Sequence, residues 1–256
     1  MARVFITGSS DGLGLAAGRL LVEQGHQVVL HARNAQRADE TRRNLPAAAT
    51  VLMGDFASLA EVRALAEQAN ALGTFDAVIH NAAIGYREKK RSLTVDGFEH
   101  VFAINTLAPY LLTALMYRPK RLVYLSSELH RRGHTTVDDL QWERRAWNGT
   151  AAYSDTKLQD TLLAFAVARR WPGVLSNSVE PGWVATKMGG SNASGDLSLG
   201  HVTQAWLAVS DDPAAQVTGR HWFHQKERKP LAAANDTTLQ DELLEQCATM
   251  SGVDLP

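Results

Sequence analysis

The sequence predicts an α/β fold in which one mostly parallel, doubly wound sheet of seven strands is flanked by helices. Two observations lead to this prediction. Short apolar runs alternate with longer segments of helical period, and a glycine-rich turn joins the first run to the first helix. No repeat, low-complexity tract or Pro/Gly/Ser-rich linker divides the chain, so we expect residues 1–256 to form a single domain.

The individual elements follow from local patterns. The first helix is predicted at 12–23, with Leu13, Ala17 and Leu21 on one face and Gly25 as its stop signal. A capping box, Ser58-Leu-Ala-Glu61, starts a later helix. Residues 237–249 are predicted to form a docking helix through Leu239, Leu243, Leu244 and Cys247. The predicted strands are 3–7, 27–31, 50–53, 75–80, 121–125, 175–179 and 219–224.

Composition excludes several classes of function. Twenty-six Lys+Arg against 27 Asp+Glu leave a net charge of -1, which argues against nucleic-acid or membrane binding and favours a small-molecule partner. The longest nearly apolar stretch, 107–117, is shorter than the about 20 residues of a membrane span. A single cysteine and a start that enters a strand without an apolar leader favour a cytoplasmic location. Nine histidines without ligand spacing predict no metal site.

The turn between the first strand and the first helix predicts a dinucleotide site. It contains Gly8, Ser10, Gly12, Leu13 and Gly14. Glycines allow positive φ angles, a close approach of backbone N–H groups to a pyrophosphate, and tight packing of the helix on the sheet. The alternative is an ordinary glycine turn, because short glycine patterns recur by chance.

The Gly-x-x-x-Gly-x-Gly spacing resembles that of the short-chain dehydrogenase/reductase (SDR) family, and the resemblance runs over nearly the whole chain. It implies a Rossmann-type fold and a role for Asp55 and Phe56 near the adenine. The fourth strand is followed by Asn81, Ala82 and Ala83, where His80 and Ala83 depart from the family's Asn-Asn-Ala-Gly. An added methyl at Ala83 could crowd the adenosine ribose. The family turn that flanks the nicotinamide corresponds to Pro181, Gly182, Val184 and Thr186.

Charge at the end of the second strand predicts the cofactor. A dinucleotide with a free 2′-hydroxyl needs an acid there, whereas a 2′-phosphate needs a cation. Ala32 stands at the acid position and Arg33 follows it. We therefore predict NADP(H), preferred over NAD(H), although a solvated arginine is the alternative and the glycine loop contains no basic residue.

Tyr153 and Lys157 form the predicted catalytic pair. Residues four apart share a helix face, so phenol and ammonium can converge. A unit charge roughly 4 Å away at an effective dielectric near 20 contributes about 4 kcal/mol, enough to lower a phenol pKa by about 3. The family resemblance adds Ser127, which hydrogen-bonds the substrate carbonyl, and Asn105, which orders a proton relay. Their alternatives are a strand-end hydroxyl and a polar residue bonded to helix backbone.

The segment between serine and tyrosine indicates a branch of the family. Tyr153 lies 26 positions after Ser127, so segment 128–150 is enlarged, and it resembles the retinol dehydrogenase and protochlorophyllide reductase branch. That branch handles bulky apolar carbonyls and alcohols. We predict a substrate loop at about 186–200 and substrate contacts that could equally be core or lid packing. These candidate contacts are Tyr86, Trp142, Trp147, Trp183 and Met188.

The sequence thus predicts an NADP(H)-dependent oxidoreductase that transfers a hydride between nicotinamide and a carbonyl or alcohol. The main alternative is a catalytically silent dinucleotide-binding scaffold of the same fold. A sugar-nucleotide epimerase is disfavoured by the glycine spacing. The family commonly pairs helices near 106–117 and 153–169 across a twofold axis, so we expect a homodimer or homotetramer.

Overall fold

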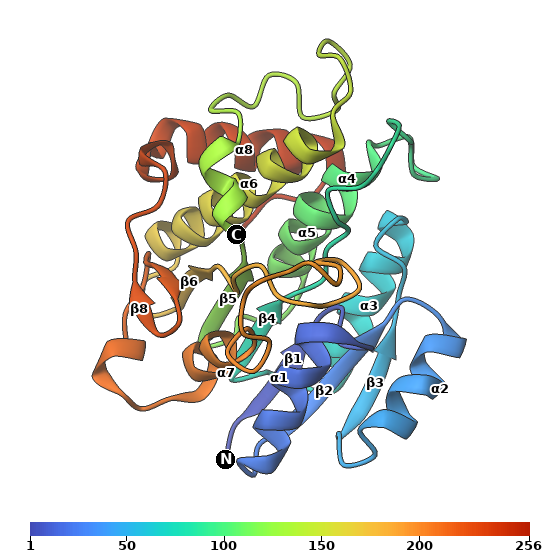
Figure 1. The fold of residues 1–256 in the computed structure, drawn as a ribbon, viewed down its shortest axis with the longest axis vertical. Coiled ribbons are helices and arrows are strands. Elements are labelled where there is room, and N and C mark those ends of the chain that lie inside the picture. Colours follow the sequence, from blue (N-terminus) through green and yellow to red (C-terminus); the bar gives the residue numbers. More distant parts are fainter.

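Eight strands form a single sheet in the order β3-β2-β1-β4-β5-β6-β7-β8 (Figure 1). The computed structural model describes residues 1–256. Every neighbouring pair is parallel except β7 and β8, which are antiparallel. The strands are β1 (Arg3–Ile6), β2 (Gln27–Ala32), β3 (Thr50–Met53), β4 (Ala77–His80), β5 (Arg121–Leu125), β6 (Leu175–Val179), β7 (His221–Phe223) and β8 (Lys226–Glu227).

The predicted α/β fold with a mostly parallel sheet is confirmed, but the predicted number of seven strands is wrong by one. The additional strand β8 pairs with β7 through a tight hairpin turn at His224 and Gln225. Both residues have positive φ angles, 47° and 58°. Hairpins of this kind usually carry Asn-Gly or Asp-Gly, and His-Gln gives no such signal.

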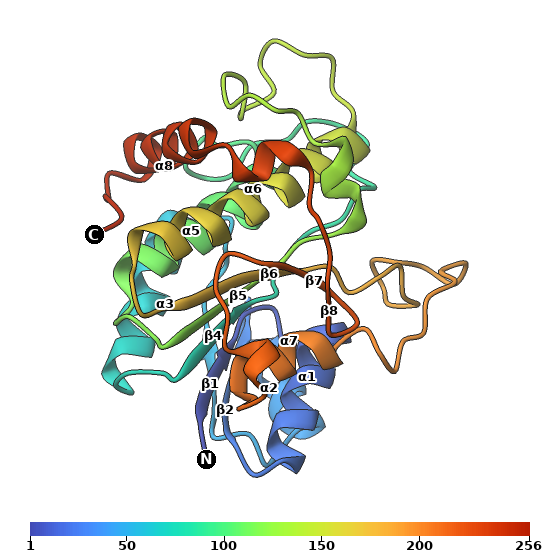
Figure 2. The ribbon, with the colours of Figure 1, turned by 90° about the vertical axis from the view of Figure 1, so that its left-hand side faces the viewer.

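Helices cover both faces of the sheet (Figure 2). One face is covered by α1 (Gly12–Glu23), α2 (Ala35–Asn44) and α7 (Val202–Val209). The other is covered by α3 (Leu59–Ala71), α5 (Ala108–Leu115) and α6 (Gly149–Arg170). None of the helices combines the length and the apolar character needed to cross a bilayer. The short helical segments are α4 (His100–Phe102), η1 (Ala103–Leu107), η2 (Glu128–Arg132), η3 (Pro213–Ala215) and η4 (Ala232–Asn235).

Two predicted helix starts fall where the sequence places them. Helix α1 spans the predicted 12–23. Ser58 caps α3 by accepting a hydrogen bond from the Glu61 N–H. The reciprocal half of the capping box does not form, because the Glu61 carboxylate accepts the N–H of Asp55 instead, at 2.7 Å. The same carboxylate therefore steadies the turn that follows β3.

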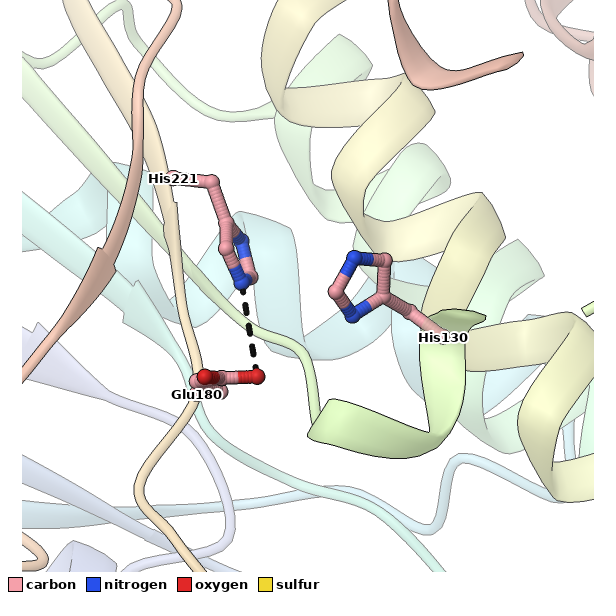
Figure 3. Close-up of side chains that lie close together, drawn as sticks. All are labelled: His130, Glu180 and His221. Carbon is pink, nitrogen blue, oxygen red and sulfur yellow. Dashed lines mark ion pairs between the residues drawn. The ribbon is translucent and has the colours of Figure 1, made fainter. Parts of the chain in front are cut away.

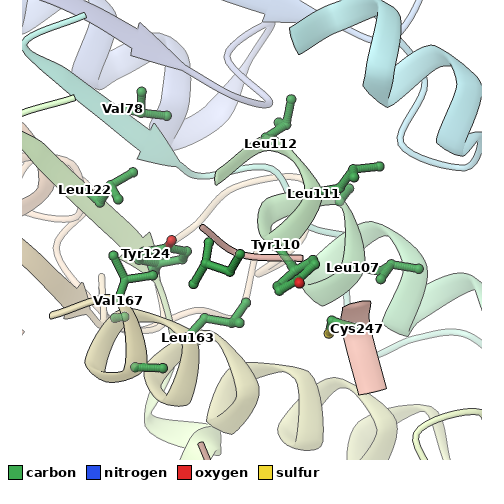
Figure 4. Close-up of a cluster of buried hydrophobic side chains, with 14 of the residues drawn as sticks. Val78, Leu107, Tyr110, Leu111, Leu112, Leu122, Tyr124, Leu163, Val167 and Cys247 are labelled. Atoms are coloured by element: carbon green, nitrogen blue, oxygen red, sulfur yellow. The ribbon is translucent and has the colours of Figure 1, made fainter. Parts of the chain in front are cut away.

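Helix α8 (Thr237–Ser251) adds an outer layer, since it packs on both α5 and α6. Its predicted docking residues Leu239, Leu243, Leu244 and Cys247 are all buried in the larger of the two hydrophobic clusters. Figure 4 shows part of this cluster, in which Cys247 lies near Tyr110 and Leu107 of the neighbouring helix. This layer makes one face of the sheet thicker than the other.

The same helix bears on the expected assembly, in which helices near 106–117 and 153–169 pair across a twofold axis. Every residue of α6 from 152 to 167 is buried within one chain, and α8 covers both α5 and α6. The chain's own C-terminal helix therefore covers part of the helices expected to pair, and the homodimer or homotetramer stays a prediction.

Truncating the α8 contact tests this layer. Leu243 has no solvent exposure, so Leu243→Ala should lower the free energy of unfolding by about 2–5 kcal/mol through lost burial and a residual cavity. Val95 is 84% exposed, and Val95→Ala should change the free energy of unfolding by less than about 0.5 kcal/mol. Denaturant unfolding of both variants measures the difference. Equal stabilities would contradict the packing described for α8.

Candidate active site

A cleft of about 710 Å³ lies at the carboxyl ends of the parallel strands. Residues from the glycine loop, the ends of β2 to β5 and helix α6 line it together. This is the edge at which doubly wound sheets bind ligands. The predicted site residues that line the cleft are Gly8, Ser10, Gly12, Leu13, Arg33, Asp55, Phe56, Asn81, Ala82, Ala83, Tyr153, Lys157, Pro181, Thr186 and Met188.

The glycine loop is locked to the end of β4. The N–H groups of Asn81 and Ala82 both donate to the Thr7 hydroxyl at 3.0 Å, and the Asn81 amide donates to the carbonyls of Thr7 and Gly8. Gly8 has a φ of 60°, and an added Cβ would lie 2.5 Å from the Ala82 Cα. A Cβ on Gly14 would lie 2.5 Å from the Asn81 amide nitrogen, so this glycine allows close packing behind the cleft.

The amino-terminal end of α1 fits a pyrophosphate. Asp11 occupies its cap position but makes no capping hydrogen bond. Its carboxylate instead contacts Arg37 at 2.5 Å and Lys187 at 2.7 Å. The first-turn N–H groups of α1 therefore have no side-chain cap, and Gly12 and Leu13 face the cleft. An anionic ligand would satisfy these donors and the positive end of the helix.

The end of β2 combines a buried histidine with exposed arginine. His31 accepts the Gly8 N–H at Nδ1 and bonds the Gly54 carbonyl through Nε2 at 2.8 Å, so it is the neutral tautomer protonated at Nε2. Its ring stacks on Phe56 at 4.7 Å. Burial lowers the pKa of His31 to about 4. Arg33 is exposed, lines the cleft and makes no ion pair.

Tyr153 and Lys157 are buried on α6 at the cleft, with the Lys157 Nζ 5.5 Å from the phenol ring centre. Lys157 donates to the Leu125 carbonyl and to the Asp160 carboxylate, each at 2.8 Å. The two side chains of the Lys157–Asp160 pair are each 3% exposed. The catalytic lysine is thus one half of a buried ion pair.

Lys157 lowers the Tyr153 pKa as expected, but the net shift of that pKa is upward. Burial raises the pKa of Tyr153 above its ordinary value, and the ammonium of Lys157 and the hydrogen bond of Ser127 offset this only in part. The charge of Asp160 acts in the same direction as burial. An isolated Tyr–Lys pair in solvent experiences neither this desolvation nor the third charge. Tyr153 is therefore a protonated acid at neutral pH.

Ser127 and Asn105 stand beside the cleft rather than in its wall. The Ser127 hydroxyl accepts the Leu129 N–H at the start of η2 and lies close enough to Tyr153 to lower the pKa of its phenol. Asn105 lies in η1, a π-helical turn, and its amide bonds both backbone groups of Ile84 and the Thr156 hydroxyl. Its side chain thus fixes the loop after β4 against α6.

The predicted substrate residues occupy two places. Tyr86 packs edge-on against Tyr153, with ring centres 5.7 Å apart. Its hydroxyl and the Trp183 indole both donate to the Gly189 carbonyl, so they hold the loop that also carries Met188. Val184 is buried and Trp183 is 52% exposed. Gly182 and these residues lie outside the cleft lining, while Met188 is part of it.

Trp142 and Trp147 pack within the enlarged segment and do not line the cleft. Their rings meet edge to face at 5.5 Å, and the Arg145 guanidinium lies 3.9 Å from the Trp142 ring. Arg145 also bridges Asp139 and Asp155, which clips the segment to α6. The segment therefore stands over the amino-terminal end of the catalytic helix.

His130 of η2, His221 of β7 and Glu180, which directly precedes Pro181, form a buried His–Glu–His group (Figure 3). Glu180 contacts the His221 Nε2 at 3.6 Å and Arg228 at 3.1 Å. His130 accepts the Leu231 N–H at Nε2 and donates from Nδ1 to the Ser127 carbonyl at 2.6 Å. A metal ion could bind all three only if these backbone bonds broke. The group instead ties the Ser127 backbone to the chain around Leu231.

Sequence reasoning missed several groups of this site. Arg37 reaches back from α2 to bond Ser10 and Asp11, so a cation does face the glycine loop, although it lies far along the chain. Asp160 follows Lys157 by three positions, a spacing that marks an ion pair on a helix and could have been found. The contact between Glu180 and His221 left no local signal.

The comparisons define the class of this protein. The family model described as short chain dehydrogenase matches residues 2–196. An uncharacterized oxidoreductase of Emericella nidulans is 45% identical, covering 100% of this chain and 99% of that protein. Human retinol dehydrogenase 13 is 28% identical, covering 99% and 85%. A blue fluorescent protein from a metagenomic library, solved with NADPH, has a TM-score of 0.68 at 25% identity, covering 86% and 94%.

The chain belongs to the short-chain dehydrogenase/reductase family, as its glycine loop and its Tyr153–Lys157 pair indicate. Within that family it has relatives among the retinol dehydrogenases. The protein is an oxidoreductase with a Rossmann-type nucleotide-binding fold.

Neutral, buried His31 makes stability depend on pH. Its folded-state pKa of about 4 lies below the ordinary 6.5, so an unfolded chain takes up a proton first as the pH falls. We expect about 3 kcal/mol of stability, fully present above about pH 6.5, to be lost progressively down to about pH 4. Denaturant unfolding across this range measures the loss.

His31→Gln should remove this part of the pH dependence, whereas a His134→Gln variant, changed at an exposed histidine, should retain it. If His31→Gln and the unmodified chain lose the same free energy between these pH values, His31 does not carry the effect.

Proposed function

We propose that this chain is an NADP(H)-dependent carbonyl reductase or alcohol dehydrogenase. The observation that carries the proposal is that Tyr153 and Lys157 line the same cleft as the glycine loop, with Ser127 beside Tyr153. A scaffold that only binds a dinucleotide has no chemical need for a buried phenol beside an ammonium and a hydroxyl.

Each residue then has a defined task. The bound cofactor supplies or accepts the hydride. Ser127 orients the carbonyl oxygen, and Tyr153 donates its proton to that oxygen during reduction or receives the alcohol proton during oxidation. Lys157 has one N–H left beyond its bonds to Leu125 and Asp160, and this donor serves the nicotinamide ribose. Asn105 holds the neighbouring loop and the relay path.

The preference for NADP(H) rests on charge. Arg33 is exposed at the cleft without a partner, and Ala32 offers no carboxylate to repel a 2′-phosphate. Arg37 adds a second guanidinium on the same side, although Asp11 and Glu40 already engage it. The NADPH-bound relative in structure is consistent with this choice.

The substrate is proposed to be a bulky, apolar carbonyl or alcohol. Ile84, Ile104 and Met188 line the cleft that holds Tyr153, and apolar linings suit such molecules. The relationship to retinol dehydrogenases supports the same class. A screen of ketones, aldehydes and alcohols followed by NADPH absorbance tests the activity.

Two variants separate chemistry from binding. Tyr153→Phe removes the proton donor, so turnover should fall by about 100-fold or more while NADPH binds nearly as before. Lys157→Ala should weaken both turnover and NADPH binding, because it removes the ribose donor and leaves Asp160 buried without its partner. Steady-state kinetics and cofactor titration measure these effects. Near-native turnover of Tyr153→Phe would refute its role as the proton donor, whereas an unmodified chain that binds NADPH and turns over no substrate would favour the scaffold alternative.

Arg33→Ala tests the cofactor preference. If Arg33 binds the 2′-phosphate, its loss should weaken NADPH binding by about 1.5–3 kcal/mol and leave NADH binding unchanged. Arg42→Ala is the matched control. Arg42 lies outside the cleft and pairs with Asp39, and both residues are on helix α2. Titration of both cofactors gives the result, and equal affinity of the native chain for NADPH and NADH would refute the preference.

A further inference from the structure

In the proposed reaction Lys157 binds the nicotinamide ribose, but its ion pair with Asp160 takes no part in any step. Its atoms lie 2.8 Å apart, and water is excluded because both side chains are 3% exposed. Lys157 donates a second hydrogen bond to Leu125. Two of the three ammonium N–H groups are thus committed within the protein.

The groups around Tyr153 come from three elements. Lys157 and Asp160 lie on α6, Ser127 follows β5, and Tyr86 belongs to the loop after β4. Asp160 itself faces Lys157, Tyr153 and the phenol of Tyr124 on β5. Asp160 is the one carboxylate in this set.

This arrangement determines which form of Tyr153 is favoured. An ammonium alone favours the phenolate, but a carboxylate paired with it cancels much of its field at the phenol oxygen. Burial raises the pKa of Asp160, but the Lys157 ammonium 2.8 Å away in the same water-shielded pair favours the charged carboxylate. Asp160 therefore opposes ionisation of Tyr153 under ordinary conditions.

We propose that Asp160 is a positioning residue that biases the site toward carbonyl reduction: it anchors the Lys157 ammonium and keeps the Tyr153 phenol protonated until substrate accepts the proton. In that direction the carbonyl carbon receives a hydride from NADPH, the carbonyl oxygen takes the Tyr153 proton, and Tyr153 regains a proton from solvent. This inference rests on the proposed function and adds the direction for which the site is built.

Removing the charge of Asp160 while keeping its shape tests the inference. Asp160→Asn still offers an oxygen to Lys157, but the ammonium is no longer neutralised. The midpoint of Tyr153 ionisation should fall by about one pH unit. Tyrosinate absorbance measures it without any cofactor, as the difference between each protein and its Tyr153→Phe counterpart. The pH profile of alcohol oxidation with NADP should move to lower pH by the same amount.

Asp155→Asn is the matched control. Asp155 is also a buried aspartate of α6, but it pairs with Arg145 and accepts the His134 N–H in the enlarged segment. This variant should lose stability and leave the Tyr153 titration where it is. If Asp160 had a merely structural role, Asp160→Asn would likewise lose stability and leave the Tyr153 titration unchanged.

A Tyr153 midpoint that stays unchanged or rises in Asp160→Asn would overturn the inference. Should Asp160→Asn fail to fold, Asp160→Ser removes the same charge with a smaller side chain and gives the same readout. If the native chain binds NADPH and reduces no carbonyl, the proposed function fails while the titration still decides the role of Asp160. If it reduces a carbonyl and the titration does not move, only the role of Asp160 is refuted.

Discussion

The site depends on an exchange of hydrogen bonds between helix α6 and the end of strand β5. The Lys157 ammonium donates to the Leu125 carbonyl, while the Ser126 hydroxyl donates to the Lys157 carbonyl. Thr161, one turn further, bonds the same serine. Each bond contributes only about 1 kcal/mol. Together, however, they are compatible with only one rotation of α6 about its axis and one position of α6 along the end of β5. Tyr153 is thereby placed one turn away, beside Ser127.

A helix held in this way must bury many polar groups, and the surrounding chain supplies their partners. Thr106 bonds Gln159, Asn105 bonds Thr156, and Arg145 pairs with Asp155. Unpaired polar groups at these depths would cost several kcal/mol, so the network penalises other placements of α6. The α8 layer completes the burial from the far side. Both the hydrophobic layer and the polar network therefore hold Tyr153 in one position.

The two ends of the cleft differ in how strongly charge acts. At the glycine loop, Asp11, Lys187 and Arg33 are partly or fully open to solvent, where ionic attraction is screened and a ligand can be exchanged. At the other end, Lys157 and Asp160 are shielded from water, and a single charge there has a large effect on a neighbouring phenol. The glycine-loop end is thus suited to binding a charged ligand that exchanges with solvent, and the shielded end at Lys157 is suited to proton transfer.

The features of this protein that its sequence predicts correctly are those set by short-range interactions. The glycine loop, helix α1, most strand positions and the four-residue spacing of Tyr153 and Lys157 all follow from local geometry. Contacts between segments that are distant in the chain, and the pKa shifts that these contacts cause, became visible only in the tertiary structure. Burial and the charge of Asp160 outweigh the effect of Lys157 and raise the Tyr153 pKa, and α8 packs on α5 and α6 from the far end of the chain. The tryptophans of the enlarged segment pack on each other, and Arg145 joins that segment to α6 through Asp155. Desolvation and long-range contacts depend on residues distant in the chain, and no local pattern reports them.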